Sequence, residues 1–105
     1  MKVKSKSDKL INVYAIYWIA DETYFLGEPP GYFGLLAYKS SDVEVVDNSL
    51  STDFCFMQKG TFSGVIDRIL FDDNLLDRLL ELEPEAHRLF SERLQNRSKR
   101  KGLDV

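Results

Sequence analysis

The sequence LINVYAIYWIA, residues 10–20, decides the fold, because it is the longest apolar run and the one densest in β-branched and aromatic side chains. Such a composition is typical of a β-strand. Both alternating sets of side chains along it are apolar, and only Asn12 interrupts them. Successive side chains of a strand point to opposite faces, so the run is predicted to be a central strand covered on both faces.

Shorter segments with a similar composition lie on the C-terminal side of this run. Residues 23–26, 32–39, 43–46 and 53–58 are rich in aromatic or β-branched residues, and turn-forming residues separate them. The connections are too short for crossover helices. The first half of the chain is therefore predicted to form a largely antiparallel sheet of four to five strands.

The spacing of the apolar residues changes after residue 60. Over residues 61–71 it favours a helix, while Gly64 and several β-branched residues leave a strand open. Residues 74–82 carry a leucine stripe, and a proline at the first position opens another helix that ends near residue 97. The predicted fold class is α+β, with two to three C-terminal helices packed on one face of the sheet.

One domain over residues 10–97 accounts for the core that a chain of 105 residues can bury. Residues 1–9 are predicted to be a flexible basic lead-in and residues 98–105 a basic tail. The single cysteine, Cys55, cannot form an internal disulfide, which favours the cytoplasm. The lysines before the apolar run imitate a signal peptide, but the run contains polar residues and no small-x-small cleavage site follows it.

Charge is distributed unevenly along the chain. Residues 10–92 hold fifteen acidic and five basic side chains, a net charge of −10, whereas the two ends are basic. An acidic body repels nucleic acid and attracts basic partners. Solvation of an ordinary surface explains the same charge without any partner, so both interpretations stay open.

No motif for a metal ion, a cofactor or a catalytic group is recognisable. The only histidine, His87, lies one helical turn before Ser91, a spacing that more often means two exposed neighbours than a catalytic pair. Zinc-binding patterns and a glycine-rich phosphate loop are absent from the sequence. The sequence therefore predicts neither an enzyme nor a cofactor-binding protein.

Two stretches, YFLGEPPGY at residues 24–32 and LLDRLLELEPEA at residues 75–86, resemble small immunity proteins of bacterial polymorphic toxin systems. These systems include contact-dependent growth inhibition. The resemblance covers about residues 13–94 and lies in size, acidity and organisation. It implies a protein that stays in the producing cell, binds a cognate toxin domain, often a basic nuclease, and covers or distorts its active site.

We therefore predict an immunity protein that neutralises a toxin domain through an acidic surface, without catalytic or metal-binding residues. It is expected to bind neither nucleic acid nor a membrane, and to be a monomer or a weak homodimer. The expected partner-binding residues are the acids at turns and helix starts. They are Asp21, Glu22, Glu28, Asp72, Asp73, Asp77, Glu81, Glu83 and Glu85.

Two other functions stay open. An adaptor or assembly subunit would pair an apolar strand edge with itself or with another chain, which the aromatic-rich strands favour. A nucleic-acid or ribosome-associated protein would use the basic C-terminal segment as an arm. The side chains of that arm would be Arg97, Lys99, Arg100 and Lys101.

Overall fold

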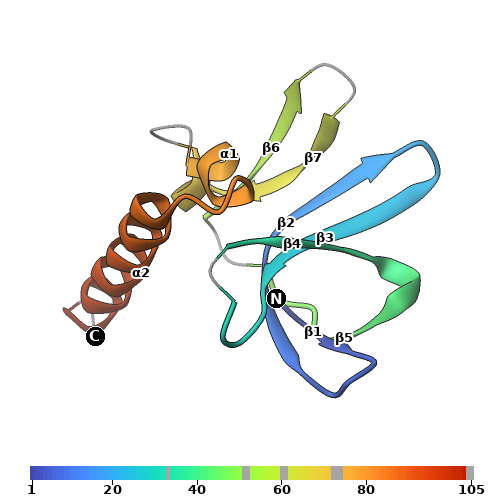
Figure 1. Ribbon diagram of the computed structural model, residues 1–105, viewed down its shortest axis with the longest axis horizontal. Coiled ribbons are helices and arrows are strands. Elements are labelled where there is room, and N and C mark those ends of the chain that lie inside the picture. The colour runs from blue at the N-terminus through green and yellow to red at the C-terminus, as the bar shows by residue number, and fades with distance from the viewer. Residues whose placement is uncertain (33, 51–52, 60–61, 72–74, 104–105) are drawn as a thin grey trace.

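The computed structural model describes residues 1–32, 34–50, 53–59, 62–71 and 75–103, and it confirms the α+β fold class (Figure 1). The strands are β1 (Lys2–Ser5), β2 (Leu10–Ile19), β3 (Glu22–Glu28), β4 (Leu36–Lys39), β5 (Val43–Asp47), β6 (Phe54–Lys59) and β7 (Phe62–Asp67). Two 3-10 turns, η1 (Ser40–Asp42) and η2 (Arg68–Leu70), precede the helices α1 (Leu75–Leu80) and α2 (Pro84–Leu103).

β2 is the central strand of the sheet, as the apolar run predicts. Along one edge it pairs with β3, and along the other edge its first residues pair with β1 and its last residues with β7. The strand order is β4-β3-β2-β1-β5, and β6 lies on the outer side of β7. All these pairs are antiparallel, so the predicted sheet type is confirmed.

Two clusters of buried side chains lie on opposite faces of this sheet. The first, called the helix core, consists of Tyr14, Ala15, Leu26, Leu35, Ile66, Leu70, Leu75, Leu79, Ala86 and Phe90. The second, called the sheet core, consists of Val3, Ile11, Val13 and Phe25. The sheet curls around this second cluster, and the single turn η1 joins its edge strands β4 and β5 (Figure 1).

A bulge in β2 connects the two cores. Val13 pairs with Gly27 and Ala15 with Leu26, so that one residue of β2, Tyr14, has no counterpart in β3. Because of this extra residue, Tyr14 and Ala15 both contribute to the helix core although they are neighbours. The ring of Tyr14 packs edge-on against a phenylalanine of α2, Phe90, with centroids 5.0 Å apart. This contact holds α2 against the sheet.

Residues 61–71 do not form the predicted helix. The described part is the strand β7 followed by η2, so the alternative of a strand is correct. Spacings of three and four also fit a strand with apolar side chains on both faces, where Ile66 enters the helix core and Val65 faces the other side. Gly64 permits the close approach of β7 to β2, since an added Cβ would lie 2.8 Å from the Tyr17 Cα.

The prediction of a flexible lead-in at residues 1–9 is wrong at its start. Residues Lys2–Ser5 form β1, and Val3 is completely buried in the sheet core. Val3 pairs with Ile11 of the next strand and with Val45, which lies far from it in the sequence. With lysines on both sides, a single valine is too short a pattern to predict a strand.

The predicted tail is also partly wrong, because α2 continues through residue 103 and only residues 104–105 lie outside the description. Arg97, expected in a basic arm, instead binds the body of the protein. Its Nη1 donates to the carboxylate of Asp67 at 2.8 and 3.0 Å and to Asp53 at 3.1 Å. Asp67 is only 3% exposed, so the arginine supplies the countercharge that a buried carboxylate needs.

No helix in the described part of the chain is both long enough and apolar enough to cross a bilayer.

Candidate functional site

The turn between α1 and α2 places an exposed apolar side chain in a strained position. Leu82 has a φ of +60°, and its backbone N–H donates to the Leu79 carbonyl at 3.1 Å. The next N–H, from Glu83, donates to the Arg78 carbonyl at 3.0 Å. Glycine is the usual residue at such a helix end, and a left-handed leucine costs about 1–2 kcal/mol. Leu82 nevertheless remains 51% exposed.

The segment between β3 and β4 packs against this turn. Gly34 has a φ of +146°, and an added Cβ would lie 2.7 Å from Leu82 Cδ2 and 2.9 Å from the Leu79 carbonyl oxygen. Only glycine fits both the backbone angle and this approach. Earlier in the segment, the Tyr32 N–H donates to the Pro29 carbonyl at 3.2 Å and forms a tight turn. The glycine therefore brings the two segments together.

A pocket of about 540 Å³ lies where these segments meet. Among the described residues it is lined by Gly31, Tyr32, Leu82, Glu83, Pro84 and His87. Its volume falls within the range of pockets that bind small ligands or single anchoring side chains. The lining combines apolar and aromatic groups with one carboxylate and one imidazole, which suits an apolar group carried beside a positive charge.

A half-buried carboxylate contacts the histidine of the pocket. Glu28 Oε2 lies 3.7 Å from His87 Nε2 and accepts no hydrogen bond from the described residues. Burial raises the pKa of Glu28, and the nearby His87 partly opposes that change. Burial, with a smaller contribution from Glu28, also raises the pKa of Tyr14 to about 12. Both pKa shifts arise mainly from burial, which disfavours the charged form of each group.

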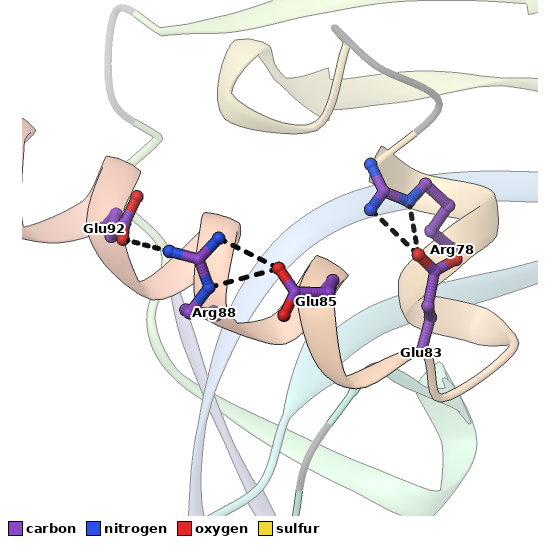
Figure 2. Close-up of polar contacts among 5 residues, drawn as sticks. All are labelled: Arg78, Glu83, Glu85, Arg88 and Glu92. Atoms are coloured by element: carbon purple, nitrogen blue, oxygen red, sulfur yellow. Dashed lines mark hydrogen bonds and ion pairs between the residues drawn. The ribbon is translucent and has the colours of Figure 1, made fainter.

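Arginines pair with two of the predicted acids at this turn (Figure 2). Arg78 donates through Nε and Nη2 to Glu83 Oε1 at 3.1 and 2.9 Å and so links α1 to the start of α2. On the exposed side of α2, Arg88 binds Glu85 at 2.9 Å and Glu92 at 2.7 Å. These arginines weaken the acidic potential, because part of it is neutralised within the chain.

Nearly half of the nine predicted partner-binding acids nevertheless lie in one region. Four of them lie on α1, on the turn and on the first turn of α2, and are called the acidic turn. They are Asp77, Glu81, Glu83 and Glu85. Residues 75–92 contain five acidic side chains against two arginines, so the region keeps a net negative charge. Glu28 lies close behind it, against His87.

Two other predicted acids lie away from this group. Asp21 and Glu22 lie at the β2–β3 turn, on the right of Figure 1, far from α1 and α2. Asp72 and Asp73 lie outside the described residues. The single acidic surface expected from the sequence is therefore divided into at least two places.

The described lining of the pocket holds one imidazole, which lies near a carboxylate. A histidine that faces a carboxylate acts as a base when a nucleophile lies within reach. The described residues that line this pocket include no serine, threonine, cysteine or lysine. Nor does the described part of the chain hold a cluster of three or more histidine, cysteine, aspartate or glutamate side chains arranged for a metal ion.

Sequence reasoning missed the apolar part of the pocket. Tyr32 and Pro84 enter the sequence analysis only within predicted elements and within the two stretches that carry the resemblance, and His87 enters it only with Ser91. The sequence around Leu82 contains a signal of the pocket. Leu82 follows the leucine stripe of α1 and lies between Glu81 and Glu83, and Glu83 is followed by the proline that starts α2. An apolar residue in such a polar turn indicates either a local contact or a binding surface.

No protein-family model, curated protein or solved structure matches this chain. The fold and the site define an α+β domain with an apolar-lined pocket beside an acidic turn.

Proposed function

We propose that this protein is an immunity protein, a stoichiometric inhibitor that binds a cognate toxin domain through the acidic turn and the adjoining pocket. The observation that carries the proposal is an apolar-lined pocket that includes one of the predicted acids, Glu83, and whose His87 contacts another, Glu28. The fitting partner is a basic protein that presents an apolar side chain flanked by lysine or arginine. The apolar side chain enters the pocket, and the cations meet Asp77 and Glu81.

The unfavourable backbone conformation of Leu82 supports this proposal. A strained residue that is half exposed contributes little to the stability of its own chain, since its side chain is not fully buried and its backbone is unfavourable. An exposed apolar side chain in a pocket gains its full burial only when a partner covers it. Leu82 is therefore assigned as the apolar contact residue of the site.

The acidic turn supports recognition of a positively charged surface. Asp77 and Glu81 are exposed, and they add negative charge to the helix and turn that precede the pocket residue Glu83. Complementary charge accelerates the encounter of two proteins and makes the association sensitive to salt. As the resemblance to immunity proteins of contact-dependent growth inhibition implies, the encounter would take place in the cytoplasm of the bacterial cell that makes the toxin.

The test compares two charge reversals of equal size. The double variant Asp77→Lys, Glu81→Lys changes the acidic turn, and Asp21→Lys, Glu22→Lys makes the same change at the distant β2–β3 turn. Tagged wild type and both variants are used to recover partners from the protein's own cells at low salt. The recovered basic domain is then expressed alone, and with each protein, in a host that lacks it.

The proposal requires three results together. The recovered domain must arrest growth when expressed alone, the wild type and the β2–β3 variant must restore growth, and the acidic-turn variant must bind at least about tenfold more weakly. A domain that is harmless by itself contradicts the immunity function. An equal loss of affinity for the recovered domain in both double variants contradicts the assignment of the acidic turn as the binding surface.

A further inference from the structure

An uncovered strip of apolar side chains crosses the face of the sheet opposite the helices. Phe56 of β6 pairs with Val65 of β7, and Val65 pairs with Ile16 of β2, so the three share one face. Trp18 lies two residues beyond Ile16 on the same face. Phe56 is 64% exposed and Trp18 is 42% exposed. Ile16, Trp18, Phe56 and Val65 are called the apolar strip.

At this end of the sheet, the helices cover one face and no described element covers the other. Neighbouring residues of the same strands, Met57 and Tyr17, pack against the helix core. On the opposite face Ile16 contacts the sheet core, and the strip continues outward from there without a covering element in the described chain. The strip therefore resembles the margin of a core that a second surface completes.

The strip ends at a strand edge that is open for pairing. Among the described strands β6 pairs only with β7, and Figure 1 shows β6 on the outer side of that hairpin. Its residues from Phe54 to Gln58 carry no charge. The other edge strands are protected, because β5 contains Glu44 and Asp47 and β4 has only four residues. β6 is longer than β4, and its only charged residue, Lys59, stands at its very end.

We propose that two copies of this chain associate by antiparallel pairing of their β6 strands, with Phe56 opposite Phe56 of the second copy. The pairing joins the two sheets and places the apolar strips side by side.

Charge explains why a second copy is the occupant. The body of the chain is strongly acidic, so most of its faces repel an identical face. The apolar strip contains no charged residue, and the two copies meet there without that repulsion. A contact made by one strand pair and a few apolar side chains is small, which predicts a dissociation constant in the micromolar range.

This inference does not rest on the proposed function, and purified protein alone tests it. Sedimentation velocity measures the mass of the wild type from about 1 to about 200 µM, a range that brackets such a constant. Phe56→Lys removes the central contact. Phe71→Lys is the matched control, because Phe71 is another exposed phenylalanine that lies outside the strip.

A concentration-dependent dimer is expected for the wild type and for Phe71→Lys, with at least about tenfold weaker association for Phe56→Lys. A wild type that stays monomeric over the whole range overturns the proposal. So does a dimer that Phe56→Lys leaves intact, or one that both lysine variants weaken equally.

Cysteine cross-linking tests the register and serves even if Phe56→Lys fails to fold. In a Cys55→Ser background, Phe56→Cys places two thiols directly opposite each other, within disulfide reach of adjacent strands. Gln58→Cys is the control, because in this register its two copies lie about 13 Å apart. Rapid disulfide formation by Phe56→Cys but not by Gln58→Cys is expected. Equal reactivity, or no cross-link from Phe56→Cys, overturns the register and the proposal.

Discussion

The two halves of β2 have similar compositions and opposite surroundings. In the first half Ile11, Val13, Tyr14 and Ala15 are all buried, since β1 and the curled sheet cover one face and the helices the other. In the last residues Trp18 and Ile19 are 42% and 50% exposed. An apolar run thus predicts a strand, while its burial depends on elements elsewhere in the chain. The uncovered half is the part available to another molecule.

The largest expected effect comes from the covered half. Phe90→Ala removes a completely buried ring that packs on Tyr14, and such truncations cost about 3–5 kcal/mol of unfolding free energy. Trp18→Ala removes an equally large apolar side chain from the uncovered half, with an expected cost of no more than about 1 kcal/mol. Urea unfolding followed by circular dichroism measures both. Similar losses would mean that the distal half of β2 is as well packed as the proximal half.

A smaller effect of opposite sign is expected at the exposed leucine of the pocket. Leu82→Gly relieves the left-handed strain and is expected to leave the unfolding free energy unchanged or to raise it by about 1 kcal/mol. If the proposed function holds, affinity for the toxin domain should fall at least about tenfold, because the proposed apolar contact residue is lost. Thermal unfolding and isothermal titration measure the two quantities.

Leu80→Ala is the control for this variant, since Leu80 is another exposed leucine in regular helical conformation two residues earlier. It should leave affinity unchanged. A Leu82→Gly variant that binds as tightly as the wild type would show that Leu82 has no role in binding. Leu82 would then be an ordinary exposed residue whose replacement, like that of Trp18, changes the unfolding free energy little.

Sequence patterns predicted the strands and helices that form because of residues within the same segment. The run at residues 10–20 and the Glu83-Pro84 helix start agree with β2 and α2. Where a structure depends on residues far away in the sequence, the prediction was wrong or left alternatives open. Val3 becomes a strand residue only through partners such as Val45, and Arg97 finds its carboxylates 30 and 44 residues away. No periodicity within either segment carries that information.

The candidate site shows the same division. Its acids were predicted because turns and helix starts are recognisable from sequence, and five of them lie at or behind the α1–α2 turn. The pocket was not predicted, because it depends on the contact between Gly34 and Leu82 across 48 residues of chain. The separation of Asp21 and Glu22 from the acidic turn likewise follows from topology, which places the β2–β3 turn away from the helices.

The smallest expected effect concerns a charge beside the covered half of β2, where Glu28 pairs in register with Asn12. Burial raises the pKa of Glu28, so the unfolded chain releases this proton more readily than the folded chain. Below the unfolded pKa the carboxyl is neutral in both states, and Glu28→Gln should match the wild type in stability. As the pH rises through the raised pKa, the wild type loses stability and the variant gains relative to it.

Unfolding free energies measured at acidic and neutral pH test this, with Glu22→Gln at the exposed turn as the control that shows no such trend. If Glu28→Gln is instead less stable than the wild type at neutral pH, the attraction of His87 outweighs the cost of burial, and the covered half tolerates this charge at no net expense.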